Sequence, residues 1–259
     1  MKPLTLCADD LGLSDAISSA IVELARGGKI NAASLMTDGP EALPAAAAMA
    51  AIPGCALGLH IALSDGLPAP RSELAPEGTL PHVDGLTMRA FRGRLPLAAI
   101  GVEIDRQFDR FEDIVGRPPD FVDGHQHVHM LPGIRTAFLS AVRRRSPNAW
   151  VRSCEDRISA IRRRGVYRWR ALRSALLSRG LRAAAGAQGL STNSSFAGLY
   201  DFNPRADYAH LFRRWLMAPG EQHLVICHPG RAVSADPIGA ARANEYAFLD
   251  SASLSQLGR

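Results

Sequence analysis

Short apolar runs alternate with amphipathic stretches along the whole chain. The runs are continuous rather than alternating and too short for buried helices, so they indicate strands buried on both faces. Between them apolar positions recur at helical spacing, most clearly over 15–26, 41–51 and 96–115, and Ser14 precedes the first of these helices as an N-cap. The predicted strands cover 4–8, 32–36, 55–61, 121–123, 149–153, 189–193 and 223–228.

Strands that alternate with helices in this way predict an α/β fold with a parallel sheet. Seven predicted strands, with an eighth hidden or missing, favour a single (β/α) barrel over 1–259, TIM-like but irregular, and closed or nearly closed. The pattern shows no internal repeat and no linker that would divide the chain. The stretch 64–86 is rich in Pro and Gly, so we expect a long substrate loop over one mouth of the barrel.

The composition excludes several protein classes. A chain of 259 residues that is 47% hydrophobic is neither disordered nor collagen-like, and its four dispersed cysteines form no disulfide framework. We therefore expect reduced, buried thiols. No apolar run reaches the roughly 18 residues of a transmembrane helix. The first residues also lack the apolar stretch of a secretory signal, which favours a cytoplasmic location.

Positive charge is concentrated in one part of the chain. Lysine occurs only at positions 2 and 29, so 28 of the 30 cationic side chains are arginines, and nine of these lie between Arg157 and Arg182. Apolar residues recur there at roughly helical spacing. This pattern predicts either an ordinary barrel helix packed on the sheet or an interfacial helix at the inner membrane face. An arginine-biased composition alone would also produce such a run. No aromatic-interleaved basic motif suggests nucleic-acid binding.

Four polar clusters fall at the carboxyl ends of predicted strands. They are Asp9-Asp10, His60, the run His-Gln-His-Val-His at 125–129, and His228. In a parallel barrel all these ends face one mouth, where active sites of this fold are built. An aspartate pair alone would be explained as a helix cap and a single histidine as a hydrogen-bonded core residue. Neither explanation accounts for three histidines in five residues beside an aspartate, and this cluster indicates a metal or catalytic site.

One aspartate with two histidines is a suitable ligand set for a catalytic divalent metal that keeps a position open for water. Such a metal lowers the pKa of its water toward neutrality. A further carboxylate can then accept the water proton, and a histidine across the pocket can protonate the leaving group. The sequence thus predicts a metal-dependent hydrolase with its site at the carboxyl-terminal mouth. Ligand softness favours zinc, with magnesium as the alternative.

Four segments in order resemble the YdjC-like carbohydrate deacetylases, a group that includes chitooligosaccharide deacetylases and the hopanoid-associated HpnK proteins. The likeness extends from residue 6 to about residue 231. It implies a (β/α) barrel, one divalent metal and hydrolysis of the N-acetyl group of an amino sugar, in an oligosaccharide or a lipid-linked glycan such as a hopanoid-type glycolipid. The segments are Ala-Asp-Asp-Leu-Gly-Leu-Ser at 8–14, Gly-Leu-His at 58–60, Asp-Gly-His-Gln-His-Val-His at 123–129 and Cys-His-Pro-Gly at 227–230.

The resemblance also implies roles for individual residues. Asp10, His60 and His125 would be the metal ligands, Asp9 the general base and His228 the general acid. The assignment of Asp9 as base and Asp10 as ligand follows related polysaccharide deacetylases, in which the first aspartate of such a pair is the base. The reverse order is the alternative.

Other positions of the family pattern are expected to support the site. His127 and His129 would orient a metal ligand through a ring nitrogen. Leu11 stands where the family usually has an aromatic residue, and Gln126 stands where many members have histidine. Both departures predict a changed substrate neighbourhood and an intact metal site.

Arg152 ends its predicted strand and faces the mouth. It would either hold a substrate oxygen or form a salt bridge with Glu155 or Asp156. Two rival functions are left open: another metal hydrolase on the same scaffold, namely a phosphoesterase or an amidase, and a membrane-surface binding protein that uses the basic segment. A homodimer would be ordinary for such an enzyme.

Overall fold

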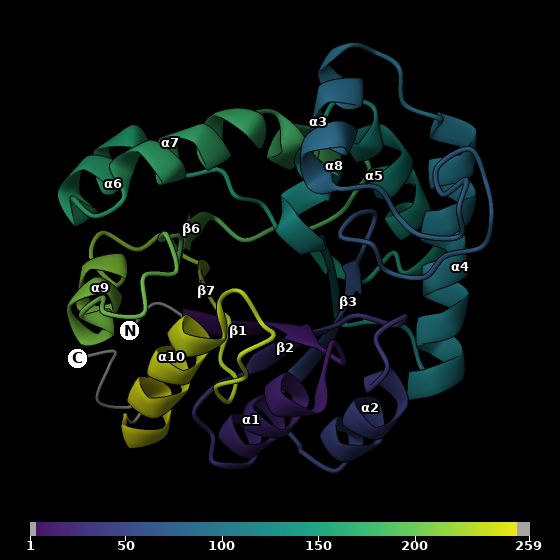
Figure 1. Cartoon of the computed structure of the whole chain (residues 1–259). Helices are drawn as coiled ribbons and strands as arrows, with labels where there is room; N and C mark the ends of the chain where they lie inside the picture. Colours follow the sequence, from purple (N-terminus) through teal and green to yellow (C-terminus); the bar gives the residue numbers. More distant parts are fainter. Residues whose placement is uncertain (1–3, 253–259) are drawn as a thin grey trace.

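Seven strands form one all-parallel sheet at the centre of the molecule (Figure 1). The computed structural model describes residues 4–252. The strand order is β5-β4-β3-β2-β1-β7-β6, so the first strand lies near the middle of the sheet and later strands extend both edges. The strands are β1 (Leu4–Leu11), β2 (Ala32–Leu35), β3 (Ala56–Ile61), β4 (Phe121–Gly124), β5 (Trp150–Val151), β6 (Ser195–Ala197) and β7 (His223–Cys227).

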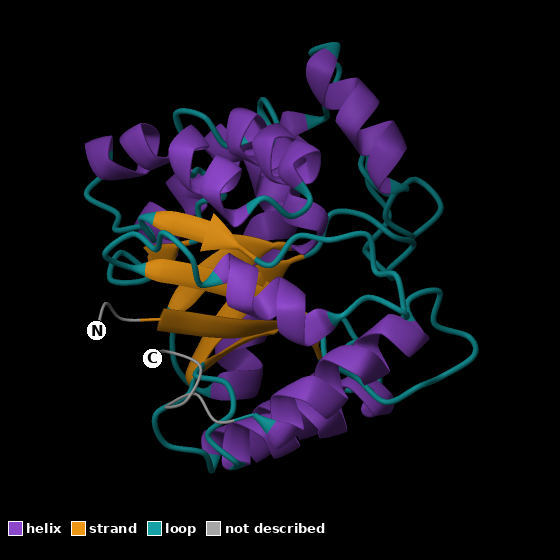
Figure 2. Ribbon diagram, turned by 90° about the vertical axis from the view of Figure 1, so that its left-hand side faces the viewer, coloured by secondary structure: helices purple, strands orange, loops and turns teal. Residues whose placement is uncertain are grey.

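Helices surround this curled sheet, as the purple and orange ribbons of Figure 2 show. In Figure 1, α1, α2 and α10 lie along one side and α4 and α5 along another. The apolar periodicity decides these positions, since Ile17, Ile21 and Leu24 of α1 are all buried. The helices are α1 (Asp15–Arg26), α2 (Ala42–Ala50), α3 (Val83–Phe91), α4 (Leu97–Val115), α5 (Ile134–Arg145), α6 (Ile158–Arg164), α7 (Arg168–Leu177), α8 (Leu181–Ala187), α9 (Tyr208–Trp215) and α10 (Gly239–Ser251), with the 3₁₀ helix η1 (His125–Met130) after β4.

The predicted α/β class and parallel sheet are confirmed, but the prediction of a TIM-like barrel is wrong, because the sheet forms only a half-barrel. Its edge strands β5 and β6 are two and three residues long. In the described part of the chain a single isolated bridge, Val151 to Thr192, joins the region of β6 to β5. The side chain of Asn193 bonds both the N–H and the carbonyl of Ser153, in place of a continuous ladder.

Two local predictions also need correction. The strand expected at 189–193 is irregular, and β6 begins only at Ser195. The segment 157–182 is divided among three short helices instead of forming one. Gly165, with a φ of +75°, ends α6, and Gly180, with a φ of +85°, immediately precedes α8, so both lie at breaks in the left-handed region that glycine adopts readily.

The expected loop after β3 is present, although it ends earlier than residue 86. An antiparallel bridge between Pro68 and Thr79 joins the two arms of this loop, and α3 begins at Val83. Ser14 occupies the N-cap position of α1, but its side chain makes no capping hydrogen bond. All four cysteines are free thiols, and three are buried as expected, whereas Cys55 is only half-buried. Across residues 4–252 no helix is both long enough and apolar enough to cross a bilayer.

Candidate metal and catalytic site

The aspartate pair lies at an irregular end of β1. Asp10 has a φ of +69°, and the register of β1 on β2 shifts between Ala8 and Leu11. In a regular strand two neighbouring side chains point to opposite faces. Here the irregularity lets Asp9 and Asp10 contact different groups of the same polar cluster. A left-handed Asp costs energy, and such strain is concentrated at functional sites.

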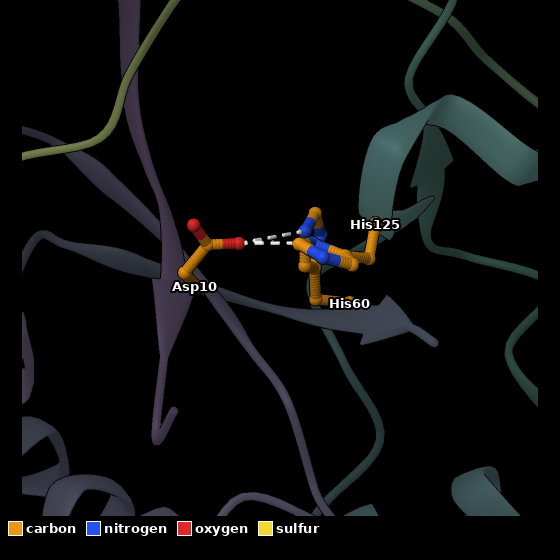
Figure 3. Close-up of side chains that lie close together, drawn as sticks. All are labelled: Asp10, His60 and His125. Atoms are coloured by element: carbon orange, nitrogen blue, oxygen red, sulfur yellow. Dashed lines mark ion pairs between the residues drawn. The ribbon is translucent and has the colours of Figure 1, made fainter. Parts of the chain in front are cut away.

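Asp10, His60 and His125 bring one ligand atom each into a small volume (Figure 3). The Oδ1 atom of Asp10 lies 3.0 Å from Nδ1 of His125 and 3.6 Å from Nε2 of His60. All three ligand atoms lie within 4.8 Å of one another. The strand ends predicted that the polar clusters of these residues would meet, the family resemblance implied this trio as ligands, and the fold brings the three side chains together.

Two of these atoms lack the partner that buried polar atoms normally have. Asp10 Oδ1 and His60 Nε2 are buried, and neither forms a hydrogen bond among the described residues. A carboxylate oxygen and two ring nitrogens that face one another in this way suit a cation. The oxygen and nitrogen atoms are also the donors that zinc accepts in catalytic sites. The residues present therefore fit a divalent metal.

The orientation of His60 is fixed by a second aspartate. Its Nδ1 lies 2.6 Å from Oδ1 of Asp123, and Ser34 donates its hydroxyl to the same oxygen at 2.6 Å. Asp123 thus accepts the Nδ1 proton of the ring, which turns Nε2 toward Asp10. Burial alone would lower the pKa of His60, but Asp123 and Asp10 raise it to about 10. The cluster therefore favours a positive charge at this point.

His125 is oriented in the same way by Asp65, which sequence reasoning missed. Its Nε2 lies 3.0 Å from Oδ2 of Asp65, which leaves Nδ1 to face Asp10. Burial would lower the pKa of His125, whereas Asp10 and Asp65 raise it. Asp65 stands in the loop after β3, where only its place within the predicted substrate loop could have drawn attention to it.

The other carboxylate of the pair is held by a buried arginine. The guanidinium of Arg152 is fully buried and lies 2.6 Å and 2.5 Å from the two oxygens of Asp9. It also lies 2.5 Å from Oδ2 of Asp123. Burial alone would raise the pKa of Asp9, but Arg152 lowers it below its ordinary value. Asp9 is thus ionised at neutral pH.

This placement of Arg152 differs from both sequence-based expectations. A fully buried guanidinium beneath two carboxylates does not face the mouth to hold a substrate oxygen. The expected salt bridges are also absent in the described structure, because Asp156 pairs with Arg164 and Glu155 accepts hydrogen bonds from Arg182. Arg152 is instead a positioning residue for Asp9.

A second arginine engages the remaining oxygen of Asp10. Nη2 of Arg242, on α10, lies 2.6 Å from Oδ2 of Asp10, while its Nε bonds Asp236 at 2.8 Å. This pairing leaves Oδ1 as the free oxygen of Asp10. It also helps to keep Asp10 ionised, since Arg242 opposes the effect of burial and lowers the pKa of that carboxyl. No local motif marks Arg242 in the sequence.

His228 lies across the cluster, at the end of β7. Its Nε2 is 3.8 Å from Oδ2 of Asp9, and its side chain is partly exposed. Its backbone N–H donates to Glu245 at 2.6 Å. Glu245 is fully buried and also accepts hydrogen bonds from the hydroxyls of Tyr200 at 2.7 Å and Tyr208 at 3.1 Å. Glu245 thus fixes the backbone that carries His228.

His127 and His129 make contacts other than those expected of them. Nε2 of His129 donates to the carbonyl of Arg152 at 3.1 Å, and Nδ1 of His127 lies 3.7 Å from Sγ of Cys154. Burial lowers the pKa of His129 to about 4 and also lowers that of His127, with Arg152 adding to both effects. Both rings are neutral. In the described residues they pack around Arg152 and form no hydrogen bond to a proposed ligand.

Comparison with known proteins assigns the chain to a family. The profile of the YdjC-like proteins matches residues 3–259. The chain belongs to that family. The resemblance noted in the sequence is therefore confirmed.

Curated relatives match part of the chain. A chitooligosaccharide deacetylase of Enterobacter sp. (strain 638) is 40% identical over 134 residues, which are 51% of this chain and 52% of that protein. A carbohydrate deacetylase of Mus musculus is 35% identical over 145 residues, which are 54% of this chain and 46% of that protein. The chain thus spans about half the length of the curated relatives it matches.

One solved structure shares the fold. The crystal structure of an Enterococcus faecalis V583 protein named for cellobiose-phosphate cleavage has a TM-score of 0.76 and 20% sequence identity. The match covers 98% of this chain and 92% of that one. At this identity the likeness supports the fold and nothing finer.

The two departures from the family pattern have different structural consequences. Leu11 is fully buried at the end of β1, so it packs in the core and does not line the mouth. Gln126 donates to Asp65 at 2.5 Å and accepts from the hydroxyl of Ser64 at 3.2 Å. Gln126 therefore ties the start of the loop after β3 to the histidine run.

Proposed function

We propose that this protein is a carbohydrate N-deacetylase, which hydrolyses the N-acetyl group of an amino sugar. The substrate would be an oligosaccharide or a lipid-linked glycan such as a hopanoid-type glycolipid. Family membership supports the proposal, and so do the names of the curated relatives. The observation that carries it is the convergence of Asp10, His60 and His125 beside an ionised Asp9 and a partly exposed His228.

One divalent ion, zinc or magnesium, would be held by Oδ1 of Asp10, Nε2 of His60 and Nδ1 of His125. The two partnerless atoms and the nearby carboxylates support a cation at this point. One aspartate with two histidines favours zinc over magnesium. When bound, such an ion polarises a carbonyl oxygen and lowers the pKa of water toward neutrality.

Asp9 would act as the general base. Arg152 keeps its carboxylate ionised and holds both oxygens in one orientation, so that Asp9 can accept the proton of an attacking water. A base with a lowered pKa is a weak one. Its contribution therefore depends on position more than on proton affinity.

His228 would act as the general acid. Its partly exposed ring lies across from Asp9, where it can deliver a proton to the amine nitrogen as the C–N bond breaks. Water supplies the new C–O bond of acetate, and the sugar leaves with a free amino group. Glu245 holds the backbone of His228 in place during this transfer.

Acetate release from N-acetylated chitooligosaccharides, with metal content measured by mass spectrometry, tests the proposal. We expect Asp10→Ala to lose both metal and acetate release, and Asp9→Asn to keep the metal while acetate release falls by roughly 10²–10⁴-fold. His210→Ala, at an exposed histidine on α9, serves as the control and changes neither. Full activity and stoichiometric metal in Asp10→Ala would refute the assignment. Phosphate release from simple esters without acetate release would favour a phosphoesterase instead.

A further inference from the structure

Helices α6 and α7 present an outward surface that combines apolar and cationic side chains. Trp169 is 83% exposed, Leu176 is 58% exposed and Ile158 is 55% exposed. On α7, Trp169, Arg173 and Leu176 are spaced four and three residues apart, so they share one stripe of the helix. On α6, Ile158 and Arg162 are related in the same way. We call the exposed side chains of these two helices the α6–α7 face.

The exposed apolar residues of this face are not the ones that pack α6 and α7 onto the rest of the protein. Ile161 on α6 is buried, and Val166 and Leu177 pack against the core. Burial of those side chains already attaches both helices. Exposed Trp and Leu side chains on the same segment therefore have no packing role in the described chain, and a cluster of exposed apolar groups marks an interaction surface.

Few acidic side chains oppose the charge of this face, although Arg170 is near enough to help lower the pKa of Asp201, which burial alone would raise. No Asp or Glu occurs from residue 157 to residue 200. Of the two acidic residues just before this segment, Asp156 pairs with Arg164, and the carboxylate of Glu155 accepts the backbone N–H of Arg182. The exposed arginines at 162, 163, 168, 170 and 173 form no ion pair within residues 4–252.

Side-chain hydrogen bonds anchor both helices to the rest of the fold, and at the end of α7 Arg135 donates to the carbonyl of Leu177. Arg164 donates to the carbonyl of Met217, and Arg214 of α9 donates to the carbonyls of Arg163 and Arg164. In Figure 1, α6 and α7 run along the upper left edge, beside α9 and away from α1, α2 and α4. A fixed, outward surface of this kind needs no folding step to bind a flat partner.

We propose that the α6–α7 face binds the surface of an anionic phospholipid bilayer. The arginines would contact lipid phosphates, and Trp169, Leu176 and Ile158 would enter the headgroup region, where Trp is preferred. Charge complementarity argues for an anionic surface. The aliphatic side chains argue for lipid over nucleic acid, because Leu176 and Ile158 gain nothing from stacked bases or phosphates. This binding is independent of the proposed hydrolase activity.

Co-sedimentation of the full chain with phosphatidylcholine vesicles, with and without 30 mol% phosphatidylglycerol, tests the proposal. We expect binding only to the anionic vesicles, and less of it at high salt. Each arginine near an anionic surface contributes about 1 kcal/mol, so the triple variant Arg168→Gln, Arg170→Gln, Arg173→Gln should bind roughly a hundredfold more weakly. A matched control removes three exposed arginines elsewhere, with Arg26→Gln, Arg143→Gln and Arg205→Gln, and should bind as the wild type does.

Tryptophan fluorescence gives a second readout. Trp215 is buried and Trp150 is half-buried, so a blue shift on addition of anionic vesicles would come from Trp169. The shift should vanish in Trp169→Phe. Equal loss of vesicle binding in the triple variant and its control would overturn the proposal, and so would binding to single-stranded RNA but not to vesicles. Acetate release by the triple variant on a soluble substrate separates this result from a failure of the proposed enzyme.

Discussion

Replacement of Arg152 by methionine should destabilise the protein strongly, because it leaves two buried carboxylates without their cation. Arg152 is fully buried, and its guanidinium lies within 2.6 Å of Asp9 and 2.5 Å of Asp123. Removal of one partner from a buried ion pair costs about 3–5 kcal/mol of unfolding free energy. For a chain of this size that corresponds to a fall in Tm of roughly 6–20 °C. Thermal unfolding followed by circular dichroism measures it.

The loss should depend on pH in a defined direction. Arg152 lowers the pKa of Asp9 below the value of about 3.9 in an unfolded chain. The stabilisation of Asp9 is therefore complete above that value and is lost as the pH falls through the lowered pKa of the folded state. The difference between wild type and Arg152→Met should be largest near pH 7 and should shrink in acid.

A second buried arginine separates stability from catalysis. Arg164 is also buried and pairs with Asp156 beside the edge strand β6, where it also donates to the carbonyl of Phe196. Arg164→Met should lower Tm as well, but each folded molecule should keep its acetate release. Arg152→Met should lose acetate release even at temperatures at which it is folded. An unchanged Tm in Arg152→Met, or full activity of its folded fraction, would contradict the stabilising and positioning roles given to Arg152.

Three further outcomes follow from other contacts of the site. Asp65→Asn should weaken metal binding by about 10–100-fold in chelator competition, because Asp65 fixes the ring of His125; unchanged affinity would contradict that role. Glu245→Gln should lower kcat more than it raises KM, since Glu245 holds the backbone of His228 and not the substrate; an effect on KM alone would argue against it. Burial lowers the pKa of His223 to about 4. The free energy of unfolding, measured in urea, should therefore fall by up to about 1.4 kcal/mol per pH unit as the pH drops from 6.5 to 4. This dependence on pH should be weaker in His223→Gln.

The central residues of the site were predictable because the geometry of a parallel sheet is simple. Asp10, His60 and His125 each end a strand or directly follow one, and parallel strands bring such ends to the same edge. Their supporting partners were not predictable in this way. Arg242 and Glu245 lie on α10, more than 200 residues from the aspartate pair, and no local pattern distinguishes them from ordinary helix residues.

The fold was predictable to the same degree. Continuous apolar runs gave the parallel strands, and the bounds of α1 agree with the predicted 15–26. Whether the sheet closes into a barrel could not be predicted from the sequence, because closure depends on how many backbone hydrogen bonds the short edge strands form with each other. The breaks at Gly165 and Gly180 had a visible signal, since glycine in a helical pattern commonly ends a helix, but the regular apolar spacing obscured it.

The most direct test of the account is acetate release by chelator-treated protein, measured as zinc or magnesium is added back. We expect no acetate from N-acetylated chitooligosaccharides without the ion, and recovery that saturates at one ion per chain, with Asp10→Ala inactive throughout. Full acetate release in the presence of chelator, or recovery in Asp10→Ala equal to that of the wild type, would contradict it.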